Sequence, residues 1–168
     1  LWVFGQRYNS DNYRENNEER RSVAKIDYQW YGDQSILTFT AGADRLDLRT
    51  PGDLLVNPDG GAPINAIDRK STDSDQDFLT LDGNNATLSA TQNMGHWTII
   101  EEVSFRDSDS SLFSSGNEEF SNIETKVWQI SPRVKYDALE LLMGSEFIFG
   151  LDYFKWDRTH TRATTPET

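Results

Sequence analysis

The sequence predicts an all-β chain, an antiparallel up-and-down meander of about seven long strands that forms part of a transmembrane β-barrel. Seven segments alternate apolar and polar residues, and most exceed the ~5–6 residues of an ordinary strand. Their connections run long, short, long, short, long, short, as extracellular loops and periplasmic turns do in outer-membrane barrels. No run of about 18 apolar residues is present, so no transmembrane helix is expected. The expected strands are Trp2–Asn9, Ser22–Tyr31, Ser35–Leu48, Phe78–Thr91, His96–Arg106, Ile123–Tyr136 and Glu140–Trp156.

The first expected hairpin turns at Gly32-Asp33, a Gly-Asp pair typical of tight turns between alternating runs. Before the turn Ala24, Ile26, Tyr28 and Trp30 share one face, and after it Leu37, Phe39, Ala41 and Ala43 share one face. Each strand therefore has one apolar and one wet surface.

The second expected hairpin turns near Gln92–Gly95. Ala86, Leu88 and Ala90 share a face before the turn, and Trp97, Ile99, Val103 and Phe105 share one after it. Glu101 interrupts the second face. Leu79 and Leu81 have the opposite parity to Leu88, so a bulge or a break is expected at Asp82–Asn85.

The third expected hairpin turns near Asp137–Leu139. Trp128, Ile130, Pro132, Val134 and Tyr136 share a face before it, and Leu141, Met143, Phe147, Phe149, Leu151 and Tyr153 share one after it. Pro132 has no N–H for the ladder, which places some strain on this strand. Trp30, Tyr31, Trp97 and Tyr136 are expected at the short-turn end, and Trp128, Tyr153 and Trp156 nearer the long loops. These positions indicate two aromatic belts, although β-strands are enriched in aromatic residues generally.

Composition bounds the classes of partner. The 168 residues carry a net charge of −12 without a basic stripe, which argues against nucleic acid and anionic inner leaflets. Metal ions, cationic ligands and sugars remain compatible. The absence of Cys excludes disulfides and thiolate metal sites. The chain starts at Leu1 without a Met or signal peptide, so we interpret residues 1–168 as one partial barrel domain, a processed or excised piece.

Few residues suggest chemistry. Asp73, Asp75 and Asp77 alternate as calcium ligands can, but the Gly and distal Glu of an EF-hand are absent, which favours a solvated loop. Asp107-Ser108-Asp109 is a weaker pattern of this kind. His96 and His160 are the only histidines and do not predict a metal site. No nucleophile has an identifiable base nearby in sequence, so neither catalysis nor a cofactor is expected.

One run of mixed charge precedes the second strand. It contains Arg14, Glu15, Glu18, Glu19, Arg20 and Arg21. An extracellular loop of this kind could contact an anionic ligand, but such runs are more often solvated surface. Tyr8 and Tyr13 could stack on a ligand, although tyrosines at strand ends usually belong to the interface belt. The ligand-binding residues are therefore left unassigned.

Four motifs, in order along nearly the whole chain, resemble the barrel portion of TonB-dependent outer-membrane receptors. They are Ser10–Asn17, similar to "s-x-G-y-R-x-N"; Arg49–Leu54, similar to "l-P-G-x-L"; Ile130–Arg133, similar to "l-s-P-r"; and Gly150–Tyr153, similar to "G-x-D-y". Asn12 stands where the family tends to have Gly, and Glu101 stands where an apolar residue facing lipid is expected.

The resemblance implies a function in the bacterial outer membrane. Such receptors take up iron–siderophore complexes or similar scarce nutrients. The nutrient passes a plug domain inside the barrel, and the TonB protein supplies the energy for this passage. Neither plug nor energy-coupling box is recognisable here, and a barrel of 22 strands needs about three times the strands of this chain. In isolation these strands are expected to form a rearranged open sheet or sandwich. The expected extracellular loops are Ser10–Arg21, Arg49–Asp77 and Asp107–Asn122.

Two other readings stay open. A secreted or periplasmic acidic β-sandwich could bind carbohydrate through exposed Trp side chains. A β-rich enzyme would need two carboxylates converging in a cleft. The sandwich and the barrel wall differ in the surroundings of one apolar face. In a sandwich this face would pack against a second sheet, and in a wall it would face detergent or another chain. The face bears Ala24, Ile26, Tyr28, Trp30, Leu37 and Phe39.

Overall fold

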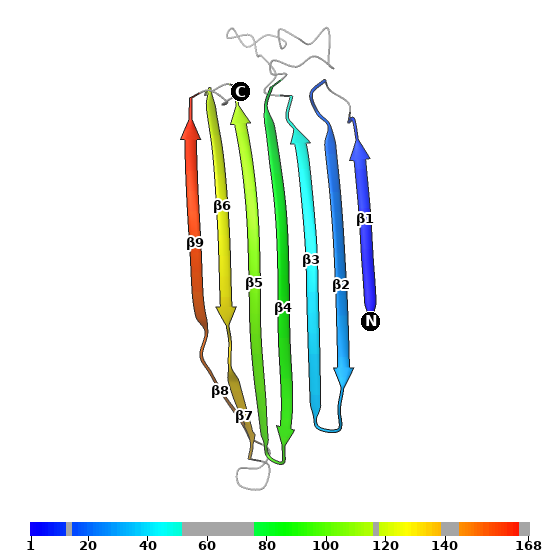
Figure 1. The fold of residues 1–168 in the computed structure, drawn as a ribbon, viewed down its shortest axis with the longest axis vertical. Helices are drawn as coiled ribbons and strands as arrows, with labels where there is room; N and C mark the ends of the chain where they lie inside the picture. Colours follow the sequence, from blue (N-terminus) through cyan, green and yellow to red (C-terminus); the bar gives the residue numbers. More distant parts are fainter. Residues whose placement is uncertain (13–14, 52–75, 116–117, 139–144, 165–168) are drawn as a thin grey trace.

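A computed structural model describes residues 1–12, 15–51, 76–115, 118–138 and 145–164. These residues form one antiparallel sheet in which neighbours along the chain pair with each other, as an up-and-down meander requires (Figure 1). Nine strands are present: β1 (Trp2–Ser10), β2 (Glu19–Tyr31), β3 (Ser35–Arg49), β4 (Phe78–Met94), β5 (Trp97–Ser114), β6 (Glu119–Ile130), β7 (Arg133–Asp137), β8 (Glu146–Gly150) and β9 (Tyr153–Ala163). The predicted all-β antiparallel meander is thus confirmed.

Nine strands rather than seven arise because two strands are interrupted. β6 pairs Ile130 with Val103, and β7 pairs Arg133 with Ile100, so both lie on β5 in one unbroken register. The Ser131 N–H also donates to the Glu102 carbonyl in between (2.8 Å). Pro132 offers no donor to the neighbouring strand, and the partner strand is interrupted at the same level, between β8 and β9. The sheet therefore has seven continuous tracks, which match the seven predicted segments.

Two expectations about the chain path are wrong. β4 keeps one register with β3 and with β5 over its whole length, so no bulge or break occurs at Asp82–Asn85. The expected loop Asp107–Asn122 is largely strand, since β5 continues to Ser114 and β6 begins at Glu119. Asp82–Asn85 and Asp107–Ser111 are polar on both faces, but hydrogen bonds to neighbouring strands hold them in the sheet, and hydropathy carries no information about those bonds.

The connections only partly follow the predicted rhythm. Residues 11–18, 50–77 and 115–118 join strands at one end of the sheet, called here the upper end. Residues 32–34, 95–96 and 138–145 join them at the lower end. The long–short alternation holds for the first two pairs and is reversed in the third. In the second lower turn Gly95 has φ +63°, a conformation that suits glycine.

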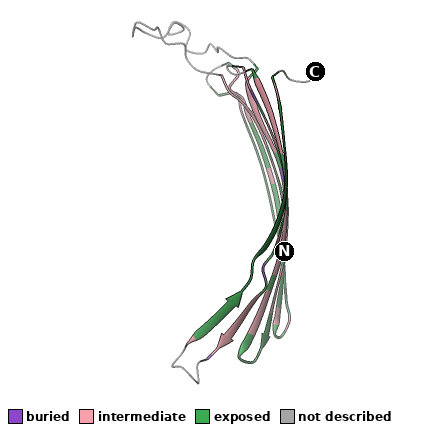
Figure 2. Cartoon of the chain, turned by 90° about the vertical axis from the view of Figure 1, so that its left-hand side faces the viewer, coloured by how far each residue is buried: buried purple, intermediate pink, exposed green. Residues whose placement is uncertain are grey.

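The sheet is a single curved layer when viewed along its edge (Figure 2). It is not closed, and the outer edges of β1 and of the β8–β9 track have no partner strand among the described residues. Phe113 and Ala138 are the only buried apolar residues of the described part of the chain. No described helix is long or apolar enough to cross a membrane. A one-layer sheet has no enclosed core, so its exposed faces are where function must be sought.

Candidate functional site: the exposed apolar face

The strand register assigns each side chain to one of two faces. Directly paired residues on neighbouring strands point to the same side, so Tyr28, Phe39, Leu88, Val103 and Ile130 share one side. We call this side face A. Face B is the opposite side, which bears Asp27, Thr40, Thr87, Ser104 and Gln129.

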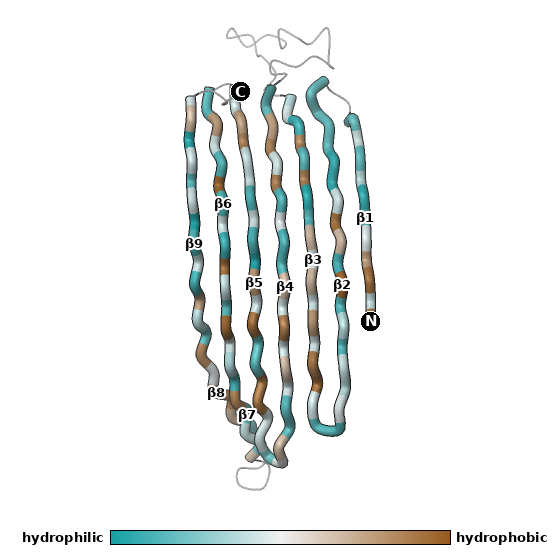
Figure 3. The backbone as a smooth tube through the Cα atoms, in the orientation of Figure 1, coloured by the Kyte–Doolittle hydropathy of each residue, from teal (hydrophilic) through white to brown (hydrophobic). Residues whose placement is uncertain are grey.

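Face A carries an apolar band across the sheet. In Figure 3 the backbone is brown at many positions in the lower halves of β3 to β6. The band contains Val3; Ile26, Tyr28 and Trp30; Leu37, Phe39 and Ala41; Ala86, Leu88 and Ala90; Trp97, Ile99, Val103 and Phe105; Trp128, Ile130, Val134 and Tyr136; and Phe147, Phe149, Leu151 and Tyr153. Most of its large side chains are exposed, from 36% for Leu37 to 70% for Leu151, whereas Ile99, Phe105, Val134 and Tyr136 are half-buried. The residues that the sequence assigns to the apolar faces of the first two hairpins all lie on this side.

The height of the band follows from strand geometry. On β5 it extends from Trp97 to Phe105, eight residues apart, which at ~3.4 Å per residue gives about 27 Å along the strand. Aromatic pairs lie at both limits: the Trp97 and Tyr136 ring centroids are 4.5 Å apart, and those of Phe105 and Trp128 are 4.6 Å apart. Such tilted pairs stabilise the surface without burying it.

Not all predicted belt residues lie on this face. Trp30, Trp97 and Tyr136 lie on face A near the lower turns, whereas Tyr31 points to face B. In the predicted upper belt Trp128 and Tyr153 lie on face A, but Trp156 pairs with Val127 on face B. The expected belts are therefore each only partly assembled on face A.

Glu101 is the one acidic residue within the band. It pairs with Ala90 on β4 and, by the continued register, lies opposite Pro132 at the interruption between β6 and β7. The sequence expectation that Glu101 interrupts the apolar face is correct. Its carboxylate lies at the level where the Pro132 backbone also lacks a donor.

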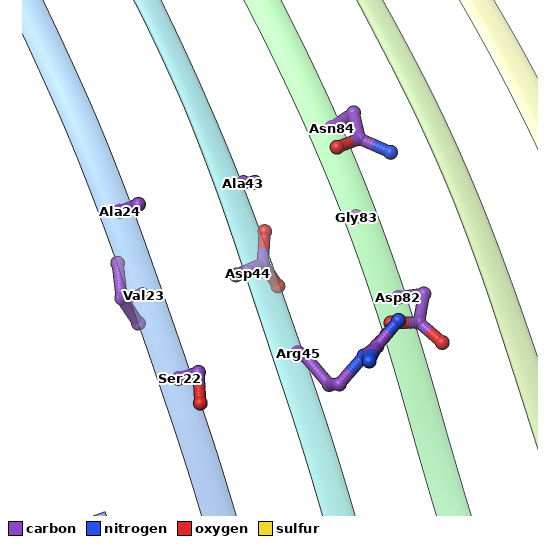
Figure 4. A pocket seen from close by; sticks show the side chains of 9 residues that line it. All are labelled: Ser22, Val23, Ala24, Ala43, Asp44, Arg45, Asp82, Gly83 and Asn84. Atoms are coloured by element: carbon purple, nitrogen blue, oxygen red, sulfur yellow. The ribbon is translucent and has the colours of Figure 1, made fainter. Parts of the chain in front are cut away.

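Above the band, face A becomes charged. One cross-strand row contains Arg7, Ser22, Arg45, Asp82, Asp109, Glu124 and Thr159. The Arg45 Nε donates to the Asp82 carboxylate, and this hydrogen bond raises the pKa of the Arg45 guanidinium. Short side chains at Ser22, Ala24 and Ala43 leave an open depression of about 370 Å³ beside the pair (Figure 4). Polar rows of this kind are compatible with water or polar headgroups, not with hydrocarbon.

Face B is mostly polar at the level of the apolar band, with exposed aromatic residues on the edge strands β1 (Trp2, Phe4) and β9 (Phe154, Trp156). Lys25 Nζ lies 3.1 Å from the Asp27 carboxylate, which also accepts a hydrogen bond from the Thr40 hydroxyl (2.6 Å). Lower on the sheet, Arg133 pairs with Asp152 at 3.1 Å. Near the upper end face B becomes apolar, with Leu46, Leu48, Leu79, Leu81 and Leu112. The polarity of face B therefore changes along the strands.

Among the described residues, the sequence-predicted ligand residues are not brought together. Of Asp73–Asp77, residues 73–75 lie outside the described residues, and the Asp77 carboxylate accepts from the Ser115 N–H (2.6 Å). Asp107 and Asp109 both lie on face A, where Asp109 accepts from Asn122 Nδ2 (3.3 Å). The described residues contain no cluster of three or more potential metal ligands.

The two histidines lie at opposite ends of the sheet. His96 belongs to the lower turn between β4 and β5, with its ring 6.4 Å from that of Tyr136. His160 pairs with Ile123 on the upper part of β9, and its Nε2 lies 2.9 Å from the Ser121 hydroxyl.

The mixed-charge run does not form one patch. Tyr13 and Arg14 lie outside the described residues, and Glu15 lies in the connection before β2. Arg20 pairs with Glu18 at 2.9 Å and points to face A, whereas Arg21 and Glu19 point to face B. Tyr8 also points to face B, opposite Arg21. The sequence pattern does not predict the charged rows of face A. These rows depend on which strands pair and in which register, and alternation within one strand carries no information about either.

A comparison of the chain with protein-family models, curated proteins and solved structures found no match.

Proposed function

We propose that this chain is part of the barrel wall of a TonB-dependent outer-membrane receptor, whose extracellular loops capture an iron–siderophore complex or a similar scarce nutrient. The observation that carries the proposal is the exposed apolar band of face A, on a sheet whose other face is mostly polar at the same level in the central strands. An outer-membrane wall needs this division, with an apolar surface toward lipid and a polar surface toward the lumen.

The size of the band supports lipid rather than water as its surroundings. Soluble monomers rarely expose apolar patches larger than a few hundred Å², and at roughly 25 cal/mol per Å² such exposure is costly. A length of about 27 Å along a strand, tilted by ~35–45° as in outer-membrane barrels, spans a height of about 19–22 Å, which is comparable to the ~25 Å of their apolar zone. The charged rows directly above the band then fit the zone beyond the hydrocarbon.

The transport role rests on the four sequence motifs that resemble the receptor family. In this role the wall contributes no covalent chemistry. Ligand would be captured at the upper end, where β3 ends and β4 begins. It would pass along face B past a plug domain supplied elsewhere, with energy from the TonB protein. Face B carries ion pairs such as Lys25–Asp27, which suit a water-filled lumen.

The alternative is a secreted β-sandwich that binds carbohydrate. In such a domain the apolar face would pack on a second sheet. The described residues form a single sheet, with Phe39 39% exposed and Leu88 47% exposed. This arrangement favours the wall over the sandwich.

The test compares neighbouring positions on opposite faces, using the absence of native cysteine. Phe39→Cys and Thr38→Cys place a nitroxide label on face A and face B of β3, respectively. The whole chain is folded into phosphatidylcholine vesicles, and collision of each label with oxygen and with a water-soluble nickel chelate is measured. We expect the label at 39 to collide mainly with oxygen and the label at 38 mainly with nickel.

Equal nickel accessibility at both positions would contradict the proposal, because face A would then face water. A label at 39 shielded from both reagents would instead support the sandwich. Failure of the chain to associate with the vesicles would also count against a membrane wall.

A further inference from the structure

A second surface lies on face B, where aromatic and cationic side chains follow one another along β9. Phe154, Trp156, Arg158, His160 and Arg162 occupy alternate positions and so point to the same side. Trp156 is 72% exposed, the largest value among the Trp side chains. The strand thus presents two aromatic rings followed by two guanidinium groups around an imidazole.

Arg106 of β5 adds a further cation to this surface. It pairs with Val127, which pairs with Trp156, so Arg106 and Trp156 lie in one cross-strand row. With ~4.8 Å between strands and ~3.4 Å per residue, the Cα atoms of Arg106 and Arg158 are about 12 Å apart. Hydroxyl groups of Ser108 and Thr125 lie in the row that ends at Arg158.

Two of these guanidinium groups have no counter-ion. No ion pair or hydrogen bond is formed by the side chains of Arg106 and Arg158 with any described residue, whereas Arg162 lies 3.4 Å from Glu119 and donates to His160 Nε2 (3.2 Å). The whole chain has a net charge of −12. A cation-rich surface on so acidic a chain is a local exception, and its unpaired groups are available to an anion.

We propose that Arg106, Arg158 and Trp156 form a binding site for a small aromatic polycarboxylate. A guanidinium group matches the two oxygens of a carboxylate, and an exposed indole offers a flat apolar surface for an aromatic ring. The spacing of the two arginines lets their side chains reach carboxylates on opposite sides of one ring that lies beside Trp156. The site goes beyond the proposed wall role, since it does not depend on lipid.

The probes are benzene-1,3,5-tricarboxylate, its uncharged triamide and citrate, which is a non-aromatic tricarboxylate. Binding to the whole chain in nonionic detergent is followed by titration calorimetry, with circular dichroism as the check on folding. We expect the aromatic tricarboxylate to bind at least tenfold more tightly than the triamide. Citrate should bind more weakly than the aromatic acid, and added salt should weaken both anions.

Two variants localise the site. Replacing both guanidinium groups in Arg106→Gln/Arg158→Gln removes two charge-assisted contacts and is expected to weaken the aromatic acid at least tenfold. The matched control is Arg7→Gln, which removes a cation that also forms no ion pair with described residues but lies on face A of the opposite edge strand. It should leave binding unchanged.

Equal binding of the acid and its triamide by the unmodified chain would overturn the proposal without any variant. An equal loss in Arg7→Gln would also overturn it, because the effect would then be one of net charge. The nitroxide measurement uses no anion and the calorimetry uses no bilayer, so failure of the site and failure of the wall proposal are distinguishable.

Discussion

Replacing Leu88 by Arg tests whether face A is surrounded by hydrocarbon or by water. Leu88 lies in the central row of the apolar band, between Phe39 and Val103 on the neighbouring strands. Its side chain is 47% exposed in the isolated sheet. The long stem of an arginine can lie along the same neighbours. The substitution therefore chiefly brings a charged guanidinium group into contact with whatever surrounds face A.

The two surroundings predict different costs. Full burial of a Leu side chain is worth roughly 1.5–3 kcal/mol. About half of that surface is already exposed and the arginine stem keeps part of the contacts, so in water Leu88→Arg should cost less than about 1.5 kcal/mol. In a bilayer, an Arg facing lipid near the midplane costs about 2–4 kcal/mol. At ~1.4 kcal/mol per tenfold change, the bilayer cost corresponds to a roughly 30- to 700-fold shift of the folding equilibrium.

The assay is urea unfolding of the whole chain in phosphatidylcholine vesicles, followed by tryptophan fluorescence. Ser89→Arg is the matched control, because it adds the same side chain one residue away on face B. We expect Leu88→Arg to be less stable than Ser89→Arg by about 2 kcal/mol or more. Equal stability of the two variants would refute the assignment of face A to lipid.

Two further predictions concern the backbone. Gly95 has φ +63° and open space where a Cβ would stand, so Gly95→Ala should destabilise the chain by about 1–2 kcal/mol through conformation alone, whereas Gly5→Ala, equally uncrowded without a positive φ, should be neutral in the same urea titration. Pro132→Val restores an N–H that faces the Leu151 carbonyl. It should therefore slow the hydrogen exchange of the Leu151 amide, which already donates to the carbonyl of residue 132. Unchanged exchange of this amide would show that proline does not cause the interruption of the two strands.

The sequence is sufficient to predict the strands whose two faces differ in polarity. Tyr28 and Phe39 are assigned to one face by alternation, and the Gly32-Asp33 turn sets their hairpin. Alternation fails where both faces are polar, as at Ser108–Ser111 of β5, because hydrogen bonds from β4 and β6 hold that segment. Hydropathy carries no information about those bonds, so the region is predicted as a loop.

The expectation of a register shift in β4 fails for a related reason. Leu79 and Leu81 have opposite parity to Leu88, and a single apolar face would require a bulge between them. The sheet instead keeps its register and places Leu79 and Leu81 on face B beside Leu46 and Leu48. A bulge is required only if each strand has a single apolar face. In β4 the apolar side chains instead lie on face B near the upper end and on face A lower down.

The candidate surfaces are predictable to different degrees. The apolar band on face A follows from period-two alternation within single strands. The juxtaposition of Arg106 with Trp156 does not, because these residues are far apart in sequence and meet only through β6. Such cross-strand rows depend on the registers of two pairings at once.

The direction of the edge strands restricts how this sheet can be extended. β1 and β9 both run toward the upper end (Figure 1). This follows because direction reverses at each step across the seven antiparallel tracks, and the number of reversals between the first and the last is even. A strand added antiparallel at either edge must therefore run downward. If further strands close this sheet into a barrel with antiparallel pairs alone, their number must be odd. The total number of strands is then even. A second copy in the same orientation would place its β1 parallel to β9, so identical copies side by side cannot complete an antiparallel wall.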